Sequence, residues 1–294
     1  MAGRLRVATY RSLATVLERL PERVDVALAR RVARWAGRPG SATRRALRAN
    51  LTTVIGAGAT DRDAHLVERL ASRAMASYGQ YWAESAKLPA LSAATITSRF
   101  VISEGRHFLD EAYAAGRGVI VALPHVGSWE WGGALLSQLG MPMTAVAEAL
   151  DPPELFEWFV GKREAIGISV VALDDSAGPA LLGTLRSGGV VGLVCDRDIQ
   201  GNGVEATLFG ERVTLPAGPA TLALRTGATL VVAACYAGPG RDHHAVVLRP
   251  IPALRQGRLR DDVARVTQAI ANDLATLIRR APEQWHVLEP RFRR

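Results

Sequence analysis

The feature that most constrains the fold of this chain is a short apolar run that ends in a histidine. Residues 118–124 read Gly-Val-Ile-Val-Ala-Leu-Pro, and a β-branched and aliphatic run bounded by Gly and Pro predicts a strand buried on both faces. His125 follows directly, and Ser128 is expected to cap the N-terminus of the next helix. The histidine is therefore expected at the carboxyl end of a buried strand, where open α/β sheets bind ligands.

Short apolar runs alternate with helical segments from residue 99 to the end of the chain. Strands are expected at residues 100–103, 118–123, 143–147, 169–173, 190–195, 229–235 and 244–249, and helices at 104–115, 128–139, 153–166, 177–187, 216–227 and 258–281. This alternation predicts an α/β fold, in which a mostly parallel central sheet is flanked by helices on both faces. We expect a single domain over residues 1–294, with an N-terminal helical part (1–98) packed on an α/β catalytic core (99–294).

The positive charge is concentrated in the first fifty residues. The formal net charge is +8, and residues 1–50 contain twelve arginines against three acids. These arginines are Arg4, Arg6, Arg11, Arg19, Arg23, Arg30, Arg31, Arg34, Arg38, Arg44, Arg45 and Arg48. Val24, Leu28, Val32 and Trp35 share one helical face, and an apolar stripe opposite arginines is typical of a helix at an anionic membrane surface. An ordinary helical layer packed on the body fits the same pattern.

Several classes of site and segment find no support in the sequence. Cys195 and Cys235 each lie in an apolar run, which predicts buried thiols rather than a disulfide or a metal site. We expect no metal and no cofactor. The longest uncharged run, residues 131–147, is broken by glycines and a proline and does not predict a membrane span. Arginines near the start interrupt any signal-peptide core, so we expect a peripheral protein at the cytoplasmic face of the membrane.

His125 and Glu130 form the first candidate pair. Glu130 is expected in the first turn of the helix that follows the histidine. A loop histidine and a first-turn carboxylate can fold back on each other, so that the carboxylate binds one ring nitrogen and leaves the other free as a base. A surface histidine, beside a glutamate favoured only by the helix dipole, is the alternative.

Further polar residues are expected at the same rim of the sheet. Glu148, Asp196 and Asp198 each come just after an expected strand, and Arg163 lies near the end of a helix. Because the carboxyl ends of parallel strands meet at one edge, these side chains are expected to lie near His125. An arginine there can stabilise an oxyanion or bind a phosphate. No G-x-S-x-G elbow or Walker loop is present, so hydrolases of those two kinds are not supported.

The segment His-Val-Gly-Ser-Trp-Glu at 125–130 resembles the signature of the bacterial lysophospholipid acyltransferase superfamily, a histidine and an acid separated by four residues. The more specific resemblance is to the branch that contains the lipid A late acyltransferases and the phosphatidylinositol mannoside acyltransferases. Its other features match Glu148, Arg163 with Gly167, the acidic turn 196–198, the region 209–219 and the Pro-x-Gln-Trp box at 282–285. Together these cover residues 100–290.

The resemblance implies acyl transfer from acyl-CoA to a sugar hydroxyl of a glycolipid, most closely a mannose of phosphatidylinositol mannoside. His125 is then the general base and Glu130 holds its imidazole. Arg163 or helix N-terminal amides stabilise the oxyanion, and Glu148 together with Asp196 or Asp198 binds the sugar hydroxyls. Acyl carrier protein as donor, and a lysophospholipid or another glycolipid as acceptor, remain open. A nucleic-acid-binding protein is a different alternative, but no recognition motif accompanies the arginines. The oligomeric state is not predicted.

Overall fold

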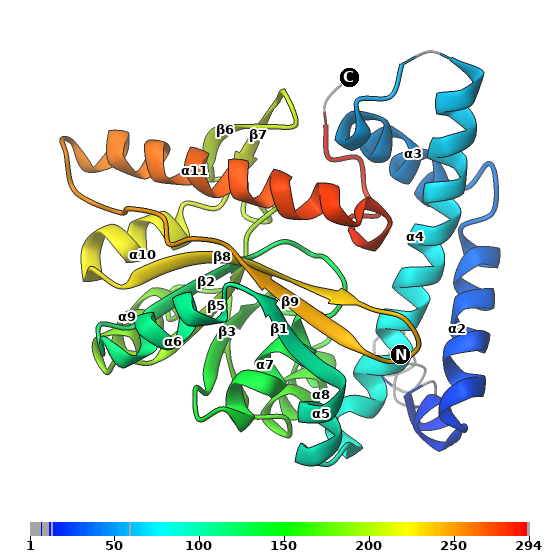
Figure 1. The fold of residues 1–294 in the computed structure, drawn as a ribbon, viewed down its shortest axis with the longest axis horizontal. Helices are drawn as coiled ribbons and strands as arrows, with labels where there is room; N and C mark the ends of the chain where they lie inside the picture. The colour runs from blue at the N-terminus through cyan, green and yellow to red at the C-terminus, as the bar shows by residue number, and fades with distance from the viewer. Residues whose placement is uncertain (1–6, 8–11, 13, 59, 293–294) are drawn as a thin grey trace.

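The computed structural model describes residues 7, 12, 14–58 and 60–292. Figure 1 shows a twisted central sheet with helices on both faces and a separate group of helices along one end. The predicted fold class, α/β with a mostly parallel sheet, is confirmed.

The central sheet has seven strands in the order β1-β9-β8-β2-β5-β3-β4. These are β1 (Phe100–Glu104), β9 (His243–Val247), β8 (Thr229–Ala237), β2 (Val119–Leu123), β5 (Val190–Val194), β3 (Met143–Ala147) and β4 (Ile168–Ala172). Neighbouring strands are parallel except β8 and β9, which are antiparallel. β2 therefore lies inside the sheet between β8 and β5, and all five of its residues are buried, as the sequence predicted.

Two apolar cores cover the two faces of the sheet. Side chains along β2 alternate between them, since Ile120 and Ala122 join one cluster and Val119, Val121 and Leu123 the other. One core is completed by α9 (Ala177–Arg186), α10 (Gly218–Thr226) and α11 (Leu259–Arg280). The other is completed by α5 (Ala93–Arg99), α6 (Arg106–Ala114) and α7 (Trp129–Gln138). The strand that carries His125 is thus held firmly from both sides.

The N-terminal helices form a layer beside one end of the sheet (Figure 1). They are α2 (Glu22–Ala36), α3 (Ala42–Ile55) and α4 (Asp61–Lys87), followed by the short η1 (Leu88–Ala90). α2 runs alongside α4 with its backbone so close that a Cβ atom on Gly79 would lie 2.4 Å from the Ala29 carbonyl oxygen. Arg4, Arg6 and Arg11 lie outside the described residues.

The predicted apolar face of α2 does not pack on the body. Val24, Leu28, Val32 and Trp35 are 48%, 45%, 55% and 68% exposed. The helix instead contacts α4 through small and charged residues, including the buried carboxylate of Asp25, which pairs with Lys87 at 2.5 Å. The stripe is left in solvent, while the opposite face of α2 packs on α4.

A two-stranded antiparallel sheet was missed by the sequence analysis, which expected only a loop between β5 and α10. β6 (Val204–Leu208) and β7 (Glu211–Leu215) pair around the turn Phe209-Gly210, where both residues have positive φ angles (56° and 86°). Apolar and polar residues alternate through β6 and over residues 212–215 of β7, and this period of two is the signal that predicts such a hairpin. α8 (Pro153–Glu164) connects β3 to β4, and η2 (Pro282–Gln284) follows α11.

Candidate active site

His125 and Asp196 are brought together by the register of two adjacent parallel strands. Leu123 of β2 pairs with Val194 of β5, and the two residues lie two positions beyond this pair on their own strands. The His125 Nδ1 atom lies 2.5 Å from Asp196 Oδ1, and the His125 backbone N–H donates to Asp196 Oδ2 at 3.0 Å. The carboxylate therefore binds both the ring and the backbone of the histidine.

Asp196 is fully buried, with 0% exposure. Burial raises the pKa of this carboxyl, but the positive charge of the His125 ring and hydrogen bonds from His125 and Trp285 outweigh it and hold the pKa at about 2. An ionised carboxylate only accepts hydrogen bonds, so Nδ1 carries a proton and Nε2 is the ring nitrogen left to exchange a proton with a substrate. The His125 side chain is 29% exposed, which gives a substrate access to the ring.

The predicted pairing of Glu130 with the His125 ring is not what the structure shows. Glu130 is on the first turn of α7, but its Oε1 atom accepts from the Tyr81 hydroxyl at 3.0 Å and from Arg163 Nη2 at 3.3 Å. The reason is the strand order. Because β2 and β5 are neighbours in the sheet, Asp196 lies beside the imidazole and occupies the Nδ1 position that Glu130 was expected to bind. Glu130 instead faces α4 and α8.

The group formed by Tyr81, Glu130 and Arg163 is mostly shielded from solvent. The side chains of Glu130 and Arg163 are 7% and 18% exposed. Burial and the neighbouring Glu130 charge raise the pKa of Tyr81 well above its usual value, so its hydroxyl stays a donor. Glu130 Oε2 and Arg163 Nε are buried without a hydrogen-bond partner among the described residues. Polar atoms of this kind are free to bind a polar group of a ligand.

A cavity of about 300 Å³ opens beside these three residues. Its wall is mainly apolar and aromatic, with contributions from α4, α8 and the segment before α2; Leu17, Tyr78, Trp82, Leu88, Trp158 and Phe159 are part of it. Tyr78 and Tyr81 also contact the ring of His286, with centroids 5.6 and 5.5 Å apart. The cavity has apolar walls and a few polar groups at one place, the usual composition of a site for an amphipathic ligand.

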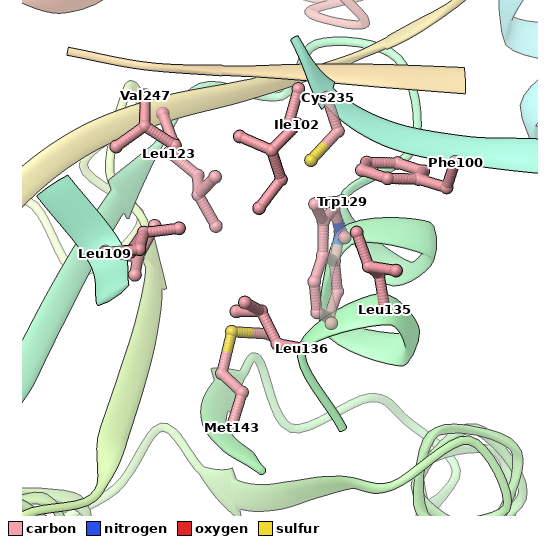
Figure 2. A pocket seen from close by; sticks show the side chains of 15 residues that line it. Phe100, Ile102, Leu109, Leu123, Trp129, Leu135, Leu136, Met143, Cys235 and Val247 are labelled. Atoms are coloured by element: carbon pink, nitrogen blue, oxygen red, sulfur yellow. The ribbon is translucent and has the colours of Figure 1, made fainter. Parts of the chain in front are cut away.

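A second apolar cavity lies between the sheet and helices α6 and α7 (Figure 2). Ile102, Leu109, Leu123, Leu136 and Met143 surround it, but it holds only about 30 Å³. It is therefore about the size of a water molecule, and we regard it as part of the core.

The other predicted site residues differ in how far their side chains can reach a substrate. Glu148 is exposed just beyond β3. Asp198 accepts from the backbone N–H groups of Gly201 and Gly203 at 3.0 and 2.8 Å, so its carboxylate is occupied with its own loop. Ser128 is the N-cap residue of α7, but its side chain makes no capping hydrogen bond. Asp196 has no exposed surface for a sugar, which excludes the expected contact between Asp196 and the acceptor.

Sequence reasoning gave no structural role to the segment 284–286, which lies directly against the His125 loop. Gln284 O accepts from Gly127 N at 2.9 Å, and His125 O accepts from His286 N at 2.7 Å. The Trp285 indole N–H donates to Asp196 Oδ2 at 2.7 Å. Burial and the charge of His125 lower the pKa of His286 to about 3, so His286 stays neutral. A tryptophan in a short Pro-x-Gln-Trp box was the available signal, but nothing in the sequence says which carboxylate it meets.

Comparison with known proteins decides the family. The model of the bacterial lipid A biosynthesis acyltransferases matches residues 6–294. The chain belongs to this acyltransferase family. A phosphatidylinositol mannoside acyltransferase of Mycolicibacterium smegmatis is 36% identical over 264 residues, which are 88% of this chain and 82% of the relative. One of Mycobacterium tuberculosis (strain CDC 1551 / Oshkosh) is 37% identical over 250 residues, which are 84% of this chain and 76% of the relative.

The predicted resemblance is thus confirmed, and the protein is an acyltransferase. Among the described residues of this acyltransferase, no helix is long and apolar enough to span a bilayer. Within the same residues, no group of three or more His, Cys, Asp or Glu side chains is arranged to hold a metal ion.

Proposed function

We propose that this acyltransferase moves a fatty acyl chain from acyl-CoA to a sugar hydroxyl of a glycolipid, a mannose of phosphatidylinositol mannoside, at the cytoplasmic face of the cell membrane. The observation that carries the proposal is the partly exposed His125 ring, whose Nδ1 lies 2.5 Å from a buried carboxylate. The names of the two relatives support the acceptor.

In the proposed step, His125 Nε2 takes the proton of the sugar hydroxyl while that oxygen attacks the thioester carbonyl carbon. The C–S bond of the resulting tetrahedral intermediate then breaks, and the imidazolium returns the proton to the sulfur. Asp196 fixes the tautomer and stabilises the imidazolium, the part a carboxylate plays in a catalytic triad. A thioester has a good leaving group, so no separate protein nucleophile is required.

Arg163 is the candidate partner of the oxyanion. Its guanidinium stacks on the ring of Trp129, 4.8 Å from the centroid, and Glu130 holds its other side. A cation fixed in this way can stabilise developing negative charge with little reorganisation. Glu130 is therefore proposed to act through Arg163 and Tyr81. Glu148 and Asp198 remain candidates for contacts with the sugar.

The cavity of about 300 Å³ is the proposed site of the acyl chain. Its aromatic and aliphatic wall suits a hydrocarbon chain, and its polar side chains, Glu130, Lys162 and Arg163, are the proposed contacts of the thioester end. No cofactor takes part in this proposal, and acyl-CoA is a substrate. The exposed stripe of α2 with its arginines supports attachment to an anionic membrane surface, and nucleic acid is not a proposed partner.

The first prediction tests the chemistry. The intact protein is incubated with labelled palmitoyl-CoA and a panel of phosphatidylinositol mannosides, other glycolipids and lysophospholipids. Label should appear on the mannoside. His125→Ala should lower turnover by about 10²–10⁴-fold, the usual contribution of general-base catalysis. Circular dichroism would confirm that the variant is folded.

A variant that keeps more than half of the activity would remove His125 from the mechanism. Label on a lysophospholipid alone would replace the acceptor but keep the chemistry, and label transferred only from palmitoyl acyl carrier protein would replace the donor. Glu111→Gln, an exposed substitution on α6, serves as the matched control and should leave turnover unchanged.

A further inference from the structure

The C-terminal segment makes two hydrogen bonds to Asp196. Besides the Trp285 indole, Arg291 Nε donates to the Asp196 backbone carbonyl at 2.9 Å. Val126 and Trp285 form an isolated antiparallel bridge. The loop that carries His125 and the strand end that carries Asp196 are thus both attached to one segment that lies far away in the sequence.

Asp196 Oδ2 is the atom on which these contacts converge. It accepts from the His125 backbone N–H at 3.0 Å and from the Trp285 indole at 2.7 Å, while Oδ1 faces His125 Nδ1 at 2.5 Å. With Oδ2 held by two N–H groups, the plane of the carboxylate is fixed and Oδ1 points at the ring. Without the indole, one backbone N–H would hold Oδ2 alone.

We propose that Trp285 is a positioning residue of the acyl transfer, which holds the Asp196 carboxylate in the orientation that presents His125 Nε2 as the base. This inference rests on the proposed role of His125. Trp285 touches neither reacting atom and acts only through Asp196.

An indole suits this task for chemical reasons. Its N–H is a donor only, so it can bind a carboxylate but cannot take up the Asp196 proton or compete for the imidazole. Its ring is large and apolar, which keeps water away from the carboxylate. Trp285 is 2% exposed and lies against Phe209 and Phe292, with ring centroids 6.0 and 6.3 Å away. The donor is therefore held rigidly in a dry environment, where a charge-assisted hydrogen bond is strong.

The second prediction tests this role with a matched pair of variants. Trp285→Phe removes the indole N–H together with part of the ring. Trp131→Phe removes the same atoms from another tryptophan that is 2% exposed, whose Nε1 has no hydrogen-bond partner among the described residues. Trp285→Phe should lower kcat roughly tenfold or more, as expected for a lost hydrogen bond to a charged group, with little change in KM for palmitoyl-CoA. Trp131→Phe should change kcat less than twofold.

A spectroscopic signal reports the positioning directly. The proton between His125 Nδ1 and Asp196 should give a far-downfield proton resonance, which Asp196→Asn assigns by removing it. In Trp285→Phe this resonance should move upfield or broaden, whereas Trp131→Phe should leave it unchanged. If Trp285→Phe does not fold, benzothienylalanine at position 285 replaces the N–H by sulfur while keeping the shape of the ring.

Equal losses in the two Phe variants, or an unchanged downfield resonance in the position-285 variant, would show that Trp285 only fills space. Loss of binding alone, with KM raised and kcat kept, would overturn the inference as well. Full activity of His125→Ala would instead refute the proposed mechanism itself. Inactive His125→Ala beside fully active Trp285→Phe would refute only the inference on Trp285.

Discussion

The Glu130 carboxylate is held on one oxygen by Tyr81 and Arg163, and its other oxygen has no hydrogen-bond partner among the described residues. A buried carboxylate beside a guanidinium balances the charge of the arginine and fixes its position. Such an arrangement places a cation in the site without letting it withdraw into solvent. Glu130 therefore positions Arg163 and does not contact the imidazole of His125.

The third prediction follows from this arrangement. Glu130→Gln leaves the Arg163 charge unbalanced and less firmly placed, so kcat should fall by about 10²–10³-fold, the range found when an oxyanion donor is lost. Tyr81→Phe removes one hydrogen bond to the same oxygen but keeps the carboxylate charge beside Arg163, so it should cost less. Steady-state kinetics of both variants, and of Glu130→Asp, measure this. Equal kcat values in Glu130→Gln and wild type would show that the charge at position 130 has no catalytic part.

The sequence was sufficient to place His125 at the end of a buried strand, because a local run of apolar residues fixes that position. It was not sufficient to identify the carboxylate that binds the imidazole. Both Glu130 and Asp196 were expected near the imidazole, and the choice between them depends on which strands are neighbours in the sheet. Strand order is a long-range property that no single run of residues encodes. The interaction of Trp285 with Asp196 is hidden for the same reason.

At the level of the elements, the core strands were predicted well because they are short apolar runs bounded by turn residues, and most helices because they have one apolar face. The elements that were missed or left undecided are those whose placement depends on tertiary packing. The hairpin of β6 and β7 was missed despite its alternation, and the apolar stripe of α2 was left undecided between solvent and core. Hydrophobic periodicity shows that a helix has an apolar face, but it does not say what covers that face.

Helix α4 connects α2 to the sheet through buried polar groups. Gln80 Nε2 donates to Glu84 Oε1 at 2.7 Å, and Arg30 donates to Gln80 from α2. Glu84 Oε2 lies 3.6 Å from His243 Nε2 of β9. Burial raises the pKa of Glu84 to about 7 and, with the charges of Arg99 and His244, lowers that of His243 to about 4. Helix α4 and strand β9 therefore meet at a pair in which both side chains are neutral between about pH 4 and pH 7.

The fourth prediction concerns the pH dependence of this junction. The folded protein retains the Glu84 proton between pH 4.5 and about 7, where the unfolded chain releases it, so this group costs stability as pH rises through that window. The full cost above pH 7 is about 3 kcal/mol. Glu84→Gln removes it, so the difference in Tm between variant and wild type should favour the variant more at pH 8 than at pH 5. The lowered pKa of His243 makes the folded protein more stable as pH rises, but this contribution is present in both proteins and cancels in the difference in Tm.

Thermal unfolding of wild type, Glu84→Gln and the exposed control Glu111→Gln at both pH values measures this effect. The control should show the same difference from wild type at pH 5 and pH 8. A Glu84→Gln variant that behaves like the control would show that Glu84 is ionised in the folded protein at both values.

For the whole molecule, the charge and the apolar surface gather on the same end. The outward side of α2 carries the stripe Val24, Leu28, Val32 and Trp35, and exposed arginines at positions 31, 34 and 38 border it. Arg38 also stacks over the Trp35 ring at 5.1 Å. The cavity proposed for the acyl chain is walled partly by α4 and by Ala14 and Leu17. A membrane docked on α2 would therefore lie near the helical layer that borders the acyl site.

The last prediction is that the intact protein co-sediments with vesicles that contain anionic lipid and that added salt weakens this binding. Each basic residue near an anionic surface contributes about 1 kcal/mol, and the effect is screened over roughly 8–10 Å at physiological salt. Charge reversal at Arg4, Arg6, Arg11 and Arg19 should release the protein while it still acylates a detergent-solubilised acceptor.

Val32→Ser with Trp35→Ser should weaken binding at every salt concentration, because this pair removes apolar area that the membrane would bury rather than charge. Val101→Ser, at a 58% exposed position on β1, is the matched control and should bind like wild type. Equal binding to neutral and anionic vesicles, insensitive to salt and to the α2 substitutions, would show that the arginines and the stripe form only a solvated surface.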